Sequence, residues 1–223
     1  IISMTIELII LGASGGCLDI IELVDDINSN NKKNKYKILG LLDDNHRNLE
    51  KKISNIEVLG NFSSVKDFKG EVKIVNALGS EKNFFDKEKL LLEDLKLLPQ
   101  RFETLIHPTC VISSTSKIGI GSIIYQNVTV GRNCQIGINN VILPNCFIGH
   151  DSSVGDFVTI NAGALISGNV KIGNKCYIGS GTKIKPFIHI NNDTLIGIGS
   201  TITKDIEKKG IHYGTPAKFI KSL

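Results

Sequence analysis

Residues 142–178 read ILPNCFIGHDSSVGDFVTINAGALISGNVKIGNKCYI, and within them Ile or Val returns at every sixth position. The same period extends in both directions, from Ile106 to Ile202, through seventeen positions without a break. A helix repeats every 3.6 residues and a strand alternates every two, so neither sustains a period of six over such a length. The pattern is typical of the hexapeptide repeat of a parallel β-helix, in which each coil stacks on the previous one.

The position four residues after each Ile or Val supports the same register. It holds small or β-branched side chains almost throughout. Gly often follows the Ile directly, which predicts a tight corner. Because no CxxC pair occurs, we interpret the cysteines in the repeat as small buried side chains, not as a disulfide framework or a metal site. Four of the five cysteines occupy the small position of the repeat: Cys110, Cys134, Cys146 and Cys176.

Composition limits the classes of function. The chain has 223 residues, a net charge of +4 and a mean hydropathy of +0.07. It contains no apolar run of the roughly 18 residues that a membrane span needs and no evident signal peptide, so we expect a cytoplasmic protein without a membrane span. Its lysines are scattered and Trp is absent, which argues against a nucleic-acid partner.

The N-terminal part begins with a predicted buried strand over residues 5–11. The strand leads into Gly12-Ala13-Ser14-Gly15-Gly16, and apolar residues then follow at helical spacing to Ile27. A glycine turn between a strand and a helix exposes backbone N–H groups at the positive end of the helix, where a phosphate can bind. A tight turn without a ligand fits the same residues.

Two more strands are expected over residues 37–42 and 72–78. The first ends in Asp43-Asp44, where a nucleotide-binding βαβ unit carries an acid that recognises ribose, although a solvated turn explains these residues equally well. The second ends at Gly79, and a helix is predicted over residues 82–98. Residues 4–104 are thus predicted to form a three-layer, Rossmann-like α/β domain with a parallel sheet, and residues 105–223 an all-β left-handed parallel β-helix with a C-terminal tail.

Only two histidines fall within the body of the predicted β-helix, His150 and His189. His150 lies at a corner, beside Asp151. An imidazole can accept a proton at neutral pH, and an adjacent carboxylate increases its basicity, although an exposed corner histidine fits as well. Residue 168, one coil of 18 residues further on, is Gly, whose N–H could stabilise an oxyanion. A metal site would need three converging histidines, so none is expected.

Several motifs along nearly the whole chain resemble those of one family, the bacterial hexapeptide-repeat acetyltransferases of sugars. This group contains sialic acid O-acetyltransferases and nucleotide amino-sugar N-acetyltransferases of the bacillosamine and perosamine type. The motifs are Gly12-Ala13-Ser14-Gly15, Leu42-Asp43-Asp44, Ile106-His107-Pro108, Gly149-His150-Asp151, Ser167-Gly168-Asn169 and Gly214-Thr215-Pro216-Ala217-Lys218.

The resemblance implies a homotrimer that binds acetyl-CoA between adjacent subunits and a nucleotide sugar in the N-terminal domain. It implies that His150 is the general base and that Asp151 increases its basicity. Two departures stand out, because many relatives carry a histidine where this chain has Gly16 and another where it has Thr159. The resemblance places Thr159, Gly168, Ser180 and Ile198 along acetyl-CoA, and Ser14, Gly15, Gly16, Asp43, Asp44 and Gly79 around the acceptor.

The expected function is therefore acetyl-CoA-dependent N-acetylation of a nucleotide-linked amino-deoxysugar in surface glycan biosynthesis. One alternative is O-acetylation of sialic acid or another sugar hydroxyl. An alternative of another class is a non-catalytic, nucleotide-binding trimer. A nucleotidyltransferase is disfavoured because residues 12–19 contain no Lys or Arg with which to grip a triphosphate.

Overall fold

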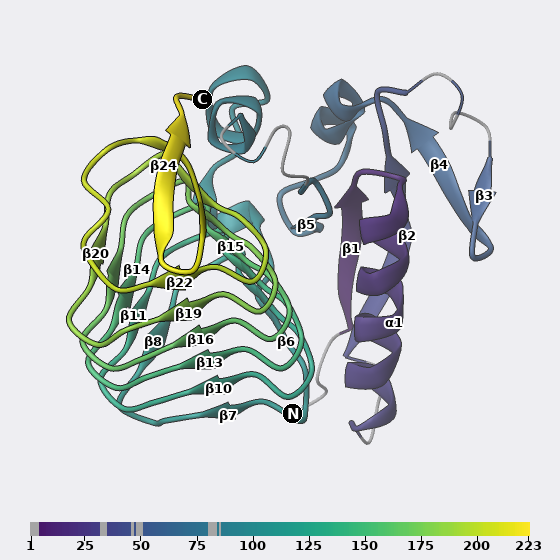
Figure 1. Ribbon diagram of the computed structural model, residues 1–223. Helices are drawn as coiled ribbons and strands as arrows, with labels where there is room; N and C mark the ends of the chain where they lie inside the picture. Colours follow the sequence, from purple (N-terminus) through teal and green to yellow (C-terminus); the bar gives the residue numbers. More distant parts are fainter. Residues whose placement is uncertain (1–4, 32–34, 46, 48–50, 80–83, 85) are drawn as a thin grey trace.

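The computed structural model describes residues 5–31, 35–45, 47, 51–79, 84 and 86–223. An N-terminal α/β part lies beside a C-terminal β-helix, and helix α1 (Gly15–Ser29) stands near the boundary between them (Figure 1). The fold class predicted from the sequence is confirmed: a domain with a parallel sheet is followed by a parallel β-helix.

The N-terminal part is built on a five-stranded sheet in the order β3-β4-β2-β1-β5. Strands β4, β2, β1 and β5 pair in parallel, and β3 pairs with β4 in the antiparallel direction. The three strands expected from the sequence are present, and β3 and β4 are additions to them. The strands are β1 (Ile6–Leu11), β2 (Tyr36–Leu42), β3 (Lys52–Ile53), β4 (Ile56–Gly60) and β5 (Lys73–Asn76).

Apolar side chains cover both faces of this sheet. On one face, α1 buries Ile20 and Val24 in a cluster that also contains Ile123 and Tyr125 of the β-helix. On the other face, a second cluster gathers Phe62 of the 3-10 helix Phe62–Asp67 together with later parts of the chain. Because both clusters include residues from beyond the N-terminal part, the two parts pack through continuous apolar contacts.

The helix predicted over residues 82–98 is confirmed only in its middle. Residues 80–83 and 85 lie outside the described residues. Within residues 86–98 the helical stretch covers residues 87–94, of which Lys89–Asp94 form a short π-helical segment, and a 3-10 turn, Pro99–Arg101, follows. Lys96 has a left-handed backbone (φ 55°), which ends the segment. The N–H of Leu97 then donates to the Leu91 carbonyl at 3.0 Å, and both leucines are buried. This bond caps the C-terminal end of the segment, so the helix ends before residue 98.

Each strand of the β-helix pairs with the strand that lies 18 residues further along the chain, as Phe147 does with Leu165. Three strands make one coil, and the strands form three sheets that are parallel except for the last strand, β24 (Ala217–Lys221), which pairs with β23 (Gly210–Gly214) in the antiparallel direction. The Ile and Val of the repeat point inward: Ile148, Ile160, Ile166 and Ile178 are all 0% exposed.

The three sheets are named here by their first strands. The β6 sheet contains β6 (Leu105–Ile106), β9 (Ile123–Ile124), β12 (Val141–Ile142), β15 (Thr159–Ile160), β18 (Tyr177–Ile178) and β21 (Thr194–Ile196), followed by β23 (Gly210–Gly214) and β24 (Ala217–Lys221). The β7 sheet contains β7 (Val111–Ile112), β10 (Thr129–Val130), β13 (Phe147–Ile148), β16 (Leu165–Ile166), β19 (Lys183–Ile184) and β22 (Thr201–Ile202). The β8 sheet contains β8 (Lys117–Ile118), β11 (Gln135–Ile136), β14 (Ser153–Val154), β17 (Lys171–Ile172) and β20 (His189–Ile190).

The glycine that follows the Ile serves a purpose different from the one expected. The left-handed residue of such a corner lies two positions later and is often Asn, as at Asn133 (φ 56°) and Asn139 (φ 51°). Asn tolerates this conformation better than other non-glycine residues. The glycine is needed because the next coil approaches closely: a Cβ on Gly149 would lie 2.5 Å from the Gly168 nitrogen.

Strand β17 offers a matched pair for testing this core, because Ile172 is 3% exposed and its neighbour Lys171 faces solvent. We expect Ile172→Ala to lower the free energy of unfolding by about 2–5 kcal/mol, since it leaves a cavity between stacked coils. Lys171→Ala should change it by less than about 0.5 kcal/mol. Denaturant titration measures both values, and equal losses would contradict the inward orientation of the ladder.

Candidate active site

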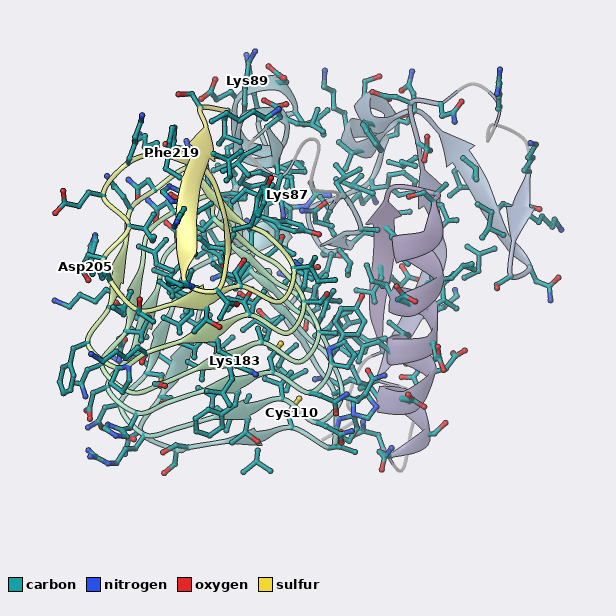
Figure 2. All side chains as sticks on the ribbon, viewed as in Figure 1. Lys87, Lys89, Cys110, Lys183, Asp205 and Phe219 are labelled. Atoms are coloured by element: carbon teal, nitrogen blue, oxygen red, sulfur yellow. The ribbon has the colours of Figure 1, made fainter. Side chains whose placement is uncertain are left out.

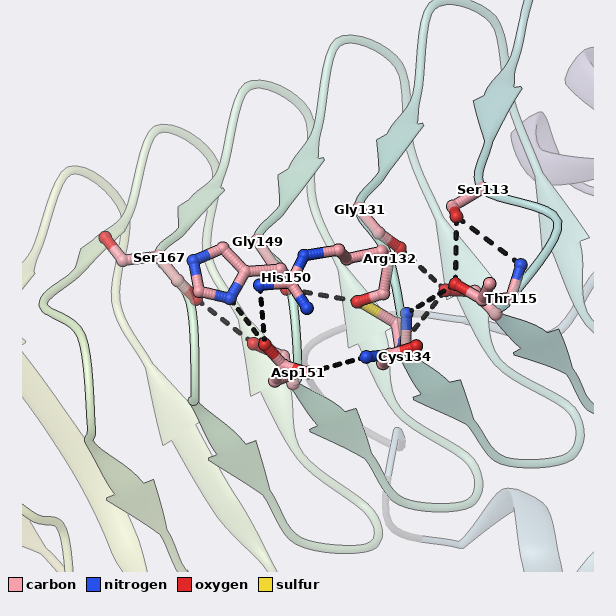
Figure 3. A network of polar contacts seen from close by, with 12 residues as sticks. Ser113, Thr115, Gly131, Arg132, Cys134, Gly149, His150, Asp151 and Ser167 are labelled. Atoms are coloured by element: carbon pink, nitrogen blue, oxygen red, sulfur yellow. Dashed lines mark hydrogen bonds and ion pairs between the residues drawn. The ribbon is translucent and has the colours of Figure 1, made fainter.

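His150 and Asp151 form a hydrogen-bonded pair at the corner between the β7 and β8 sheets. The Nδ1 atom of His150 lies 2.7 Å from the Oδ2 atom of Asp151 (Figure 3). Asp151 is the left-handed residue of its corner (φ 58°), and this conformation brings its carboxylate back beside the preceding imidazole. The His150 side chain is 51% exposed, so its other nitrogen is open to a substrate.

The Asp151 carboxylate also receives contacts from the preceding coil. The Asn133 amide donates to Oδ1 at 3.0 Å, and the Arg132 guanidinium lies 3.5 Å from Oδ2. The hydrogen bond from Asn133, then that from His150, and more weakly the charge of Arg132, hold the pKa of the Asp151 carboxyl below its ordinary value. Asp151 therefore stays ionised at a lower pH than a free aspartate, and its ionised carboxylate can accept a hydrogen bond from the Nδ1–H group of His150.

Gly168 lies directly against the imidazole. A Cβ built on this residue would be 2.8 Å from both Cε1 and Nε2 of His150, so only glycine leaves room for the ring. The coil is held at this spacing because Asn169 N–H donates to the His150 carbonyl at 2.9 Å. Within the described part of the chain, the Gly168 N–H has no hydrogen-bond acceptor.

A cavity lies between the N-terminal part and the β6 sheet. It is lined by Gly16 and Gly79 from the N-terminal part and by Thr159 and Tyr177 from the β-helix. Gly16 belongs to the first turn of α1, where backbone N–H groups lack helical partners. Ser14 precedes α1 and Gly15 begins it. Three of the predicted site residues, Gly16, Gly79 and Thr159, therefore meet here, although they are far apart in the sequence.

The two predicted acids make contacts within the protein. Asp43 is 8% exposed, and its carboxylate accepts hydrogen bonds from Ala13 N–H at 2.6 Å and Asn45 N–H at 2.7 Å. Asp44 accepts a hydrogen bond from Phe62 N–H at 2.8 Å. Asp43 thus holds the glycine turn in place, and Asp44 holds the start of the following 3-10 helix.

Ser180 and Ile198 line a second cavity, near the end of the β6 sheet, together with Tyr177 and Tyr213. Ile198 is 82% exposed, which is unusual for an isoleucine and leaves it available for contact with a ligand or another chain. This cavity and the one at Gly16 share Tyr177.

The structure does not bring all the predicted residues together within one chain. His150, Asp151 and Gly168 lie at the corner between the β7 and β8 sheets, whereas Gly16, Gly79 and Thr159 line the cavity between the N-terminal part and the β6 sheet. Sequence reasoning missed Asn76 and Tyr177 as lining residues of the first cavity, and it missed Lys87, which donates to Thr159 Oγ1 at 3.0 Å. The end of strand β5 could have indicated Asn76, whereas no sequence pattern marks Lys87.

No cluster of three or more His, Cys, Asp or Glu side chains suited to a metal ion is found among the described residues. The described helices also include none with the length and apolarity that crossing a bilayer requires.

A glycine-turn α/β domain joined to a β-helix with a histidine at its corner defines a two-domain hexapeptide-repeat protein. More particularly, residues 7–83 match the family described as the PglD N-terminal domain. No curated protein matches the sequence.

Three solved structures share the fold over nearly the whole chain. The acetyltransferase domain of PglB from Neisseria gonorrhoeae FA1090 is similar with a TM-score of 0.84 and 24% identity, over 97% of this chain and 100% of that one. A variant of perosamine N-acetyltransferase from Caulobacter crescentus, in complex with CoA and GDP-perosamine, has a TM-score of 0.82 and 19% identity, over 96% of this chain and 97% of that one. WeeI from Acinetobacter baumannii AYE has a TM-score of 0.81 and 24% identity, over 97% of this chain and 100% of that one. The resemblance inferred from the motifs is confirmed in the fold and in the N-terminal domain.

The Asp151 environment yields a direct prediction. Asn133→Ala removes the strongest of the contacts that stabilise the ionised carboxylate, so the pKa of Asp151 should rise toward the ordinary aspartate value. Arg132→Ala should raise it less, because the guanidinium acts only through its charge in an exposed setting. Carbon-13 NMR titration of the Asp151 carboxyl measures both shifts, and a larger effect of Arg132→Ala would contradict the geometry.

Proposed function

We propose that this protein transfers the acetyl group of acetyl-CoA to an amino group on a nucleotide-linked deoxysugar in surface glycan biosynthesis. The observation that carries the proposal is the His150–Asp151 pair. With the Asp151 carboxylate at Nδ1, the imidazole holds its proton there and leaves the lone pair of Nε2 free to act as a base. The same ring lies against the backbone of Gly168, where an oxyanion donor is needed.

The chemistry follows from these two groups. The amine of the acceptor attacks the thioester carbonyl and forms a tetrahedral intermediate, whose oxyanion accepts a hydrogen bond from Gly168 N–H. His150 Nε2 takes a proton from the attacking nitrogen and gives it to the sulfur as the C–S bond breaks, which yields the amide and free CoA. Asp151 remains ionised and stabilises the transient imidazolium. No covalent enzyme intermediate is required.

The relatives support the choice of substrates. The acetyltransferase domain of PglB also shares this fold in its complex with acetyl coenzyme A, with a TM-score of 0.83 and 24% identity. The perosamine N-acetyltransferase holds CoA together with GDP-perosamine. By analogy, we place the acceptor nucleotide at the glycine turn, near Ser14, Gly15, Gly16 and Gly79, and acetyl-CoA along Gly168, Ser180 and Ile198.

Oligomerisation is part of the proposal, because within a single chain His150 lies away from the cavity at Gly16. We infer a homotrimer in which the His150 corner of one subunit faces the cavity of its neighbour. An apolar stripe on the β7 sheet offers a contact surface for such an assembly: Val111, Phe147 and Leu165 follow one ladder of strands and are 65%, 43% and 45% exposed.

The role of the base is tested by His150→Ala. We expect kcat for CoA release to fall by a factor on the order of 10² to 10⁴, because general-base catalysis is lost while the fold is kept. His189→Ala is the matched control, since His189 lies on β20 and its side chain is exposed. Near-normal turnover of the His150 variant would remove this residue from the mechanism.

The shared site is tested by mixing two inactive variants. Gly79→Phe should block the cavity without disturbing the backbone, because a Cβ on Gly79 meets no atom within 4 Å. In randomly mixed trimers of Gly79→Phe and His150→Ala subunits, about one site in four combines an intact cavity with an intact histidine, so about a quarter of the wild-type activity should return. Activity no higher than that of the separate variants would place the whole site within one chain.

The acceptor class is tested by measuring CoA release against amino-sugar nucleotides and against sialic acids. Turnover with an amino-sugar nucleotide supports the proposal. Turnover only with a sugar that offers hydroxyl groups would assign O-acetylation instead. Binding of nucleotide sugars without CoA release from any acceptor would favour a non-catalytic role.

A further inference from the structure

The two positions at which this chain departs from its relatives face the same cavity. Gly16 and Thr159 both line the space between the N-terminal part and the β6 sheet. Asn76, at the end of β5, lines it as well and is 4% exposed. Its Oδ1 atom accepts a hydrogen bond from Leu78 N–H at 2.9 Å, whereas its Nδ2 donor has no partner within the described residues. A buried donor without an acceptor is costly, and a ligand oxygen would satisfy it.

Lys87 reaches the same wall of the cavity from behind. Its side chain is 2% exposed, and Nζ donates to Thr159 Oγ1 at 3.0 Å. Figure 2 shows Lys87 between the two parts of the molecule, whereas Lys89 lies at the outer edge. The segment is anchored beside Lys87 by Phe84, whose ring packs on Tyr177 with 5.6 Å between the centroids.

No carboxylate balances the charge of Lys87 among the described residues. The neighbouring Glu88 pairs with Lys175 at 3.1 Å, and Lys175 also contacts Asp193. Burial alone lowers the pKa of Lys87 to about 8, so most molecules carry the charge at neutral pH. Burying a charge without a partner is unfavourable, and a bound anion would offset that cost.

The direction of the hydrogen bond decides what Thr159 can offer. An ammonium group only donates, so Thr159 Oγ1 accepts from Lys87 and its own hydroxyl proton is free to point elsewhere. Thr159 and Asn76 thus present two donors to one cavity, with a positive charge behind them. One negatively charged side chain, that of Asp19, also lines the cavity.

We propose that Asn76 and Thr159, with Lys87 as a positioning residue behind Thr159, bind an anionic oxygen group of the acceptor. That group is a phosphate of the nucleotide or a carboxylate on the sugar. The inference rests on the proposed function only for the identity of the acceptor, because binding can be measured without acetyl-CoA and without turnover.

The test is calorimetric titration of the full chain, in the absence of CoA, with five probes: inorganic pyrophosphate, uridine, UDP, UDP-glucose and UDP-glucuronate. Lys87→Met removes the charge at nearly constant volume, and Lys89→Met removes a charge from an exposed position in the same segment. Thr159→Val removes the hydroxyl, whereas Thr159→Ser keeps it.

If the group is a phosphate, Lys87→Met and Thr159→Val should weaken the binding of pyrophosphate and UDP by about 10-fold or more, since a hydrogen bond assisted by charge is lost. Uridine binding should not change. If the group is a carboxylate, the wild type should bind UDP-glucuronate more tightly than UDP-glucose. Lys87→Met and Thr159→Val should bind the two equally. Lys89→Met and Thr159→Ser should behave like the wild type in both cases.

Thermal unfolding separates this role from a structural one. Lys87→Met should be as stable as the wild type or more stable, because it no longer buries a charge without a carboxylate partner. The proposal is overturned if Lys87→Met binds every probe as the wild type does, if the wild type binds no anionic probe, or if Thr159→Ser loses binding as Thr159→Val does. If the wild type binds the anionic probes but transfers no acetyl group to any acceptor, the proposed function is overturned and this binding site is not.

Discussion

The close stacking of one 18-residue coil on the next is the constraint on which the molecule depends. Backbone hydrogen bonds join successive coils at every strand, and the ladder of Ile and Val fills the space within them. At the corners the coils approach so closely that Gly149 has no room for a Cβ beneath the Gly168 nitrogen. This spacing creates the His150 site, because it places a histidine of one coil against the bare backbone of the next.

The electrostatics of that corner also come from the stacking. Asn133, Asp151 and Asn169 occupy the same position in three successive coils, and each has a left-handed backbone. The first supports the Asp151 carboxylate, and the last holds the coil that carries Gly168. The carboxylate of Asp151, between asparagines in the coils before and after it, gives the adjacent imidazole an acceptor for Nδ1. The corner is therefore suited to a proton-accepting role although its side chains are largely exposed.

The N-terminal part serves a different face of the β-helix. Its helix α1 and the segment that carries Lys87 both pack on the β6 sheet, so the cavity at Gly16 has walls from both parts of the chain. Asn76 and Lys87 are buried polar groups in this contact, and neither has a carboxylate partner among the described residues. Groups of this kind cost stability, which is why we connect them with a ligand and not with the fold.

The sequence alone determined the β-helix, since a period of six has no other regular solution, and it determined the strand and glycine turn at the N-terminus. It also singled out His150, Asp151 and Gly168, because a fixed coil length of 18 residues converts sequence spacing into spatial contact. The tertiary structure alone decided where the helix before Pro99 ends, because Leu91 and Leu97 are both buried in one apolar cluster on either side of its left-handed C-terminus. It alone decided that Gly16, Asn76, Lys87 and Thr159 meet, since the packing of two separate folding units follows no sequence period.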